Sequence, residues 1–149
     1  MAGVQANAVT GQVALAAATL KTVLQIVAAA NHRVLLWAYY VSFEGVVTTD
    51  APVFCELLRQ STAGTMSALT PVKVNDGDNE TLLTTALHTA TAEPTAGDVL
   101  KKWFVHPQGR DVYIYPLTRP IVVLGGARLG IRFTAANAVD CIAGFEYEE

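Results

Sequence analysis

Serine and histidine are the residue types in this 149-residue chain with the best-known catalytic uses. A hydrolase-type serine nucleophile needs a glycine two positions before and two positions after it, and none of the serines has that setting. These serines are Ser42, Ser61 and Ser67. The histidines share no short metal-ligand spacing, so we expect them to be structural or surface groups. They are His32, His88 and His106.

Acidic and glycine-rich segments of the sequence are candidates for binding a metal ion or a nucleotide. The segment "NDGDNE" gathers Asp76, Asp78 and Glu80 around Gly77, and carboxylate oxygens of this kind can bind calcium. The acids do not follow the EF-hand order, so the segment favours a solvated turn. The glycines of "LGGARLG" also lack the order of a dinucleotide-binding loop, and we interpret Gly125–Gly126 as a hairpin turn or a bulge.

The two cysteines, Cys55 and Cys141, lie far apart and match no paired metal spacing. Both fall among the apolar residues of their segments, which predicts buried free thiols. The sequence therefore predicts no catalytic residue, no metal and no cofactor, and a protein that is not an enzyme.

Composition limits the partners of the chain. Hydrophobic residues make up 52% of it and charged residues 15%, which is little charge for the surface of a free-standing small protein and indicates that apolar surface meets a partner. The net charge of -3 argues against nucleic acid as a ligand. No segment has the pattern of a signal peptide or a membrane span, so we expect a protein made in the cytoplasm with no membrane partner.

Residues 1–17 are small and uncharged and show no convincing period. We expect an extended N-terminal arm that binds a partner through its backbone instead of joining the core. Its expected contact residues are Val4, Gln5, Asn7, Val9 and Gln12.

We predict that residues 18–149 form a single domain. They contain roughly nine short segments, most of which alternate apolar and polar residues, as expected for strands. Turn-forming residues separate them, as in "HPQGR", "TRP" and "LGGA". Only "NETLLTTALHT" leaves helix and strand equally open. Strands at this spacing predict an all-β sandwich or barrel.

The segment 32–45, "HRVLLWAYYVSFEG", raises the main question about function. One parity of the segment is apolar throughout, from Leu35 and Trp37 to Phe43, and we expect it to face the core. The other parity should face solvent, yet it begins with Val34 and Leu36. A strand with two apolar faces indicates that the second face is covered by something else.

The chain resembles capsid decoration, or cement, proteins of tailed bacteriophages. The resemblance covers residues 19–149, and its most distinctive elements are Glu93-Pro94-Thr95, Gly97 and His106-Pro107-Gln108-Gly109. It implies a jelly-roll β-sandwich that forms homotrimers, binds the major capsid protein on the exterior of the virion and stabilises the head. The trimer would cover the second apolar face of the segment 32–45, together with nearby aromatic residues. The interface residues expected on this basis are Val34, Leu36, Tyr40, Tyr113 and Tyr115.

Two other functions compete with this one. A trimeric carbohydrate-binding or receptor-binding head of a phage tail fibre or baseplate uses a similar jelly roll. A cupin-type enzyme is a third possibility, but the short His and Glu motifs of a cupin are absent from the sequence.

Overall fold

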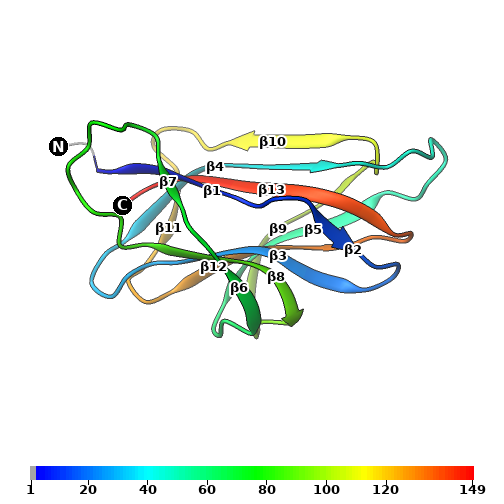
Figure 1. Cartoon of the computed structure of the whole chain (residues 1–149), viewed down its shortest axis with the longest axis horizontal. Coiled ribbons are helices and arrows are strands. Elements are labelled where there is room, and N and C mark those ends of the chain that lie inside the picture. The colour runs from blue at the N-terminus through cyan, green and yellow to red at the C-terminus, as the bar shows by residue number, and fades with distance from the viewer. Residues whose placement is uncertain (1–2) are drawn as a thin grey trace.

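A computed structural model describes residues 3–149, and every regular element within them is a β-strand. The strands form two antiparallel sheets that pack face to face as a β-sandwich (Figure 1). The seven-stranded sheet contains β1 (Gln5–Val9), β2 (Val13–Leu15), β4 (Val34–Phe43), β7 (Val72–Lys73), β10 (Arg110–Ile114), β11 (Ile121–Val123) and β13 (Val139–Glu148). The six-stranded sheet contains β3 (Leu20–Val27), β5 (Val53–Gln60), β6 (Thr65–Leu69), β8 (Thr85–Ala92), β9 (Ala96–Val105) and β12 (Arg128–Thr134).

The order of the strands differs from their order in the sequence. The seven-stranded sheet runs β10-β4-β13-β1-β7, with β11 also beside β4 and β2 also beside β13. The six-stranded sheet runs β6-β8-β3-β12-β5-β9. Most connections therefore carry the chain from one sheet to the other. The turn at Gly125–Gly126 is one of these, since it joins β11 of one sheet to β12 of the other and is neither the hairpin nor the bulge expected from the sequence.

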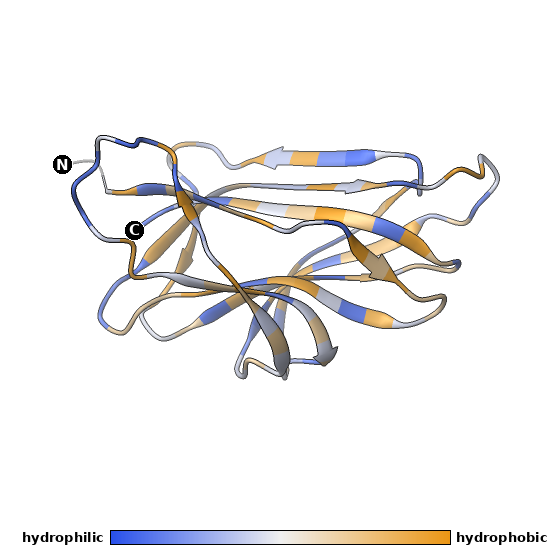
Figure 2. Cartoon of the chain, viewed as in Figure 1, coloured by the Kyte–Doolittle hydropathy of each residue, from blue (hydrophilic) through white to orange (hydrophobic). Residues whose placement is uncertain are grey.

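The core lies between the two sheets and explains the period-two pattern of the sequence (Figure 2). Tyr39 and Phe145 of the seven-stranded sheet are fully buried, as are Ile131 and Phe133 of the six-stranded sheet. The rings of Phe43 and Phe133 meet edge to face across the interface, with centroids 5.2 Å apart. The predicted all-β sandwich is thus confirmed, and the segment 79–89, for which helix and strand were equally open, forms the start of β8 from Thr85 onward.

The N-terminal segment does not form the free arm that the sequence suggested. Residues 5–9 pair with both β13 and β7, and residues 13–15 pair with β13. Five of its side chains join the same core as the rest of the chain: Val4, Ala6, Ala8, Val13 and Leu15. The expected boundary between residues 17 and 18 is therefore not a domain boundary, although the first two residues of the expected arm lie outside the described residues.

The physical reason for this correction is the size of the side chains. Ala6 and Ala8 are too small to produce a visible hydrophobic period, but both are completely buried between strands. The strand also gives β13 a hydrogen-bonding neighbour on the side away from β4. Of the expected contact residues, Val4 is buried, Asn7 is half-buried, and Gln5, Val9 and Gln12 are exposed.

No helix that could cross a membrane is found in residues 3–149.

Candidate functional site

A β-bulge in β4 explains why the segment 32–45 has two apolar faces. Ala38 pairs with Glu146 of β13 and Leu36 pairs with Tyr147, so Trp37 is an extra residue without a partner. The extra residue reverses the alternation of the strand. Before the bulge the even-numbered residues face the core, and after it the odd-numbered residues do.

The bulge corrects two of the expected interface residues. Val34 and Leu36 are completely buried within the chain's own core, so they cannot contact another subunit. Leu35 and Trp37, which we expected in the core, lie half-buried on the outer side of the sheet. Tyr40 does lie on the outer side, as expected, and is half-buried there.

An apolar outer face does exist on the seven-stranded sheet, but different residues form it. Strand register places Val112 beside Tyr40, Val122 beside Leu35 and Ile142 beside Ser42. Ile114 of β10 is the most exposed member, at 73%. We call this surface the apolar face and define it as Leu35, Tyr40, Val112, Ile114, Val122 and Ile142. Figure 2 shows β10 changing from hydrophilic at its start to hydrophobic at its end.

Tyr40 lies at the centre of the apolar face. Its ring covers Gly144 on the neighbouring strand, where a Cβ atom would overlap with the ring. Burial raises the pKa of the Tyr40 phenol, and the nearby Glu146 carboxylate raises it further. Glycine at position 144 thus lets an aromatic ring lie flat on the outer surface of the sheet.

An acidic cleft adjoins the apolar face. It has a volume of about 210 Å³ and is lined by Gln5, Asn7, Trp37, Val74 and Glu146. The indole Nε1 of Trp37 donates a hydrogen bond to Oε2 of Glu148 at 3.2 Å, which fixes the orientation of the ring. The bulge creates the wall of the cleft, because it places Trp37 beside Ala38 on the outer side of β4. We call this the Trp37 cleft.

A second aromatic group closes the edge of the sandwich between β9 and β10. Tyr39 stacks on Tyr113 with centroids 5.8 Å apart, and Trp103 and Tyr115 pack against Tyr39 at 5.1 and 6.3 Å. The ammonium group of Lys101 lies 3.8 Å from the centroid of the Tyr113 ring and contacts the hydroxyl of Tyr39. Cation–π attraction therefore lets an ammonium group lie among aromatic rings.

Burial controls the ionisation of this edge. It raises the pKa of Tyr39, with further increases from Asp111 and the neighbouring tyrosines. It also raises the pKa of Tyr115 to about 12, with a smaller contribution from Tyr113. Tyr113 itself is 39% exposed. Two of the expected interface residues, Tyr113 and Tyr115, therefore lie at this edge, beside the apolar face and not within it.

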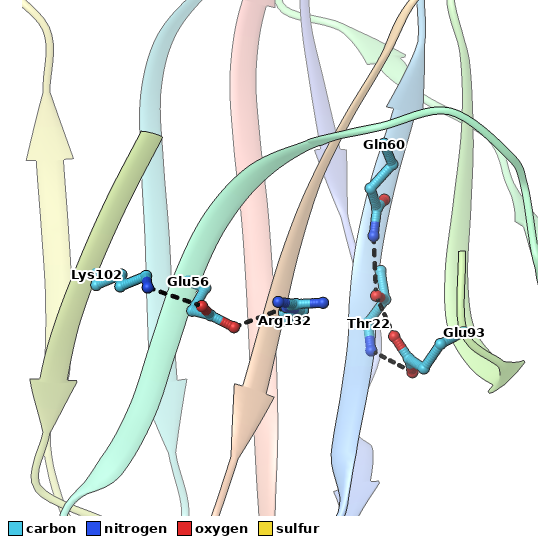
Figure 3. A network of polar contacts seen from close by, with 6 residues as sticks. All are labelled: Thr22, Glu56, Gln60, Glu93, Lys102 and Arg132. Carbon is cyan, nitrogen blue, oxygen red and sulfur yellow. Dashed lines mark hydrogen bonds and ion pairs between the residues drawn. The ribbon is translucent and has the colours of Figure 1, made fainter. Parts of the chain in front are cut away.

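The outer side of the six-stranded sheet carries a network of polar groups (Figure 3). The Glu56 carboxylate accepts a hydrogen bond from Nε of Arg132 at 2.7 Å and lies 4.0 Å from Nζ of Lys102. Farther along, Thr22 donates from its amide and its hydroxyl to the Glu93 carboxylate, at 2.8 and 2.6 Å. Nε2 of Gln60 donates to the Thr22 hydroxyl at 3.0 Å.

Two connections cover this polar network. The segments 61–64 and 93–95 pass across the sheet together, joined by a hydrogen bond from the Ser61 amide to the Thr95 carbonyl at 3.0 Å. Gly64, with a φ of +60°, lets the first segment approach the second, since a Cβ there would overlap with the backbone of Ala92. The acidic residue of the Glu93-Pro94-Thr95 motif thus holds a connection to the sheet, and each polar group named here has a partner.

The other chemistry-bearing residues of the sequence occupy separate places. Cys55 and Cys141 are free and buried, as predicted, and burial raises the pKa of Cys141 to about 12. Nε2 of His106 lies 3.1 Å from the Thr48 carbonyl, and Nδ1 of His88 lies 2.9 Å from the Thr89 hydroxyl. No group of three or more metal-ligating side chains converges anywhere in residues 3–149.

The Trp37 cleft is not visible in the pattern of any one segment. The composition of residues 1–17 predicts an arm for Gln5 and Asn7, and Glu146 lies on the polar parity of its segment. One signal is present, since the apolar residues of the segment 34–43 change parity between Leu36 and Tyr39. A change of parity within one strand is the pattern of a bulge.

Comparisons of the chain with protein-family models, with curated proteins and with solved structures found no match.

Proposed function

We propose that this protein is a structural subunit that forms homotrimers and binds the major capsid protein on the outside of a tailed-bacteriophage head. In this proposal it is a capsid decoration protein made in the host cytoplasm, and it is not an enzyme. The observation that carries the proposal is the apolar face, which no other part of residues 3–149 covers. A contiguous apolar sheet surface in a chain with 15% charged residues is typical of a surface that meets another protein.

Jelly-roll topology is part of the proposal. One sheet contains the run β1/β2–β13–β4–β10/β11, and the other contains the run β3–β12–β5–β9. When β1 and β2 are counted as one strand, this first strand lies beside the last one, β13, and the second strand, β3, lies beside the second-last one, β12. Two interlocked Greek keys produce this order. The strands β6 and β8 then form an addition that extends the second sheet beyond β3. This order supports the resemblance stated from the sequence.

The trimer is tested by changing the apolar face. Tyr40→Asp and Ile114→Asp should each convert the trimer to monomers, because a carboxylate loses its hydration when the face is covered. Multi-angle light scattering measures the mass, which should be about three times 15.8 kDa for the unchanged protein. Ile114 is 73% exposed in the single chain, so its substitution should not disturb folding.

Val46→Asp is the matched control, because Val46 is 85% exposed and lies in the connection between β4 and β5. It should leave the trimer intact. An unchanged protein that is monomeric at every concentration would contradict the trimer.

Attachment to the capsid is tested by co-sedimentation with expanded, empty heads of the phage that carries the gene. Saturable binding at a fixed number of copies per head is the expected result. Absence of binding to heads, together with binding to host cells or to isolated surface glycans, would instead support the receptor-binding head of a tail fibre or baseplate.

A further inference from the structure

The Trp37 cleft offers hydrogen-bond acceptors that have no donors. No hydrogen bond or ion pair engages the side chain of Glu146 within residues 3–149. The side-chain oxygen of Asn7 is buried and likewise accepts no hydrogen bond from the described part of the chain. The register places these two residues directly opposite each other on β1 and β13. An aromatic ring beside a free carboxylate and a free amide oxygen favours a cationic, donor-rich ligand, above all a guanidinium group.

The turn between β10 and β11 has the complementary chemistry. Leu117, at 86%, is the most exposed large apolar side chain of the described residues. Arg119 is exposed as well, and its guanidinium forms no ion pair or hydrogen bond with any residue from 3 to 149. We call residues 116–119 the Leu117 turn.

The Leu117 turn is fixed in shape before any partner binds. The Arg119 amide donates to the Pro116 carbonyl at 2.8 Å, and the Tyr115 amide donates to the Trp37 carbonyl at 2.7 Å. Prolines at positions 116 and 120 restrict the backbone on both sides of the turn. Little conformational entropy would therefore be lost when the turn is bound.

We propose that the Leu117 turn of one copy of this chain binds in the Trp37 cleft of the next copy. Leu117 packs between Trp37 and Val74, and the guanidinium of Arg119 pairs with the Glu146 carboxylate. The contact rests on the self-association proposed above and specifies its chemistry. The cleft volume of about 210 Å³ suits one or two side chains, since sites for drug-sized molecules measure about 300–1,000 Å³.

The two halves of this contact occupy different parts of the same chain. The turn lies at the β10–β11 edge of the sheet, whereas the cleft lies over β13 between β4 and β1. Figure 1 shows the β10–β11 connection at the same end of the molecule as β7. A contact between unlike surfaces is heterologous, and repeating it closes a ring when the rotation from one copy to the next is a whole fraction of a turn. A cyclic trimer buries three such contacts and leaves no turn or cleft unpaired.

Charge exchange tests the contact. Glu146→Arg and Arg119→Glu should each raise the dissociation constant of the trimer at least about tenfold, because each places like charges in the contact. The double variant should restore the trimer to within about threefold of the unchanged protein, since the ion pair is re-formed in reverse. Sedimentation velocity over a concentration series measures the constants. Glu80→Arg, at an exposed acidic residue outside the cleft, makes the same change of net charge and should have no effect.

The outcomes separate this inference from the proposed function. If the unchanged protein is trimeric and the Glu146→Arg and Arg119→Glu variants remain trimeric as well, the proposed contact is wrong but the proposed trimer is not. The same holds if both single variants dissociate the trimer and the double variant does not restore it. An unchanged protein that is monomeric would overturn both proposals.

A second measurement identifies other occupants of the cleft. Titration with N-acetylarginine amide or with methyl glucoside is followed by the indole N–H resonance of Trp37, assigned with Trp37→Phe. In the trimer the cleft should be filled, so neither compound should shift the resonance. A shift in the intact trimer would show an open cleft and overturn the contact.

Discussion

Replacement of Leu15 by alanine tests whether the N-terminal segment belongs to the core. Leu15 lies on β2, is 2% exposed and pairs with Val139 of β13. If residues 1–17 formed a free arm, Leu15→Ala would have no effect on stability. Because the side chain is buried, its truncation should lower the free energy of unfolding by about 2–5 kcal/mol, from lost hydrophobic transfer and from the cavity that remains.

This loss is large compared with the total stability of a domain of this size, which is about 5–15 kcal/mol. It corresponds to a decrease of about 4–20 °C in the melting temperature. The assay is urea denaturation followed by circular dichroism at one protein concentration, because self-association makes apparent stability depend on concentration. The urea midpoint should fall while the slope stays the same.

Two variants of the same segment complete the design. Ala14→Ser changes an exposed side chain of β2 outside the Trp37 cleft and should leave the midpoint unchanged. Leu15→Met conserves volume and should cost less than about 1.5 kcal/mol. Equal midpoints for Leu15→Ala and Ala14→Ser would refute the assignment of β2 to the core.

Two further predictions concern buried charge and alkaline pH. Glu56→Gln should lower the free energy of unfolding by about 2–4 kcal/mol, because the Arg132 side chain is only 15% exposed and would lack its carboxylate partner. Lys102→Ala, on the exposed side of the same group, should lower it by under about 1 kcal/mol. Equal urea midpoints for the two variants would contradict the network. Stability should also fall between about pH 9 and 12, because burial raises the pKa of Tyr115 and of Cys141 to about 12. In that range the unfolded chain releases protons that the folded chain retains. A urea midpoint that is constant up to pH 11 would contradict this prediction.

The fold class was predictable from the sequence because it depends on local patterns. Alternation in the segments 128–134 and 139–147 places Phe133 and Phe145 on the inner side, and the structure buries both completely. Turn residues marked the ends of most strands. Patterns of this kind require only the residues of one segment.

The candidate site was not predictable in the same way, because it depends on register and on small residues. The bulge at Trp37 is defined by the partners of Leu36 and Ala38 on β13, about 110 residues later in the chain. The strand β1 is held by backbone pairing and by buried alanines, which carry a weak hydrophobic signal. The Trp37 cleft combines these two features, so neither segment indicated it alone.

The bulge also makes the Trp37 cleft separable from the core. Trp37 is the residue of β4 that has no partner on β13, so its deletion would restore an uninterrupted alternation along the strand. The buried residues before and after the bulge would then share one parity, and all of them would still face the core. The deletion should therefore preserve the sandwich while it removes the indole wall of the cleft. Related chains that lack the extra residue should keep the fold and lose the cleft.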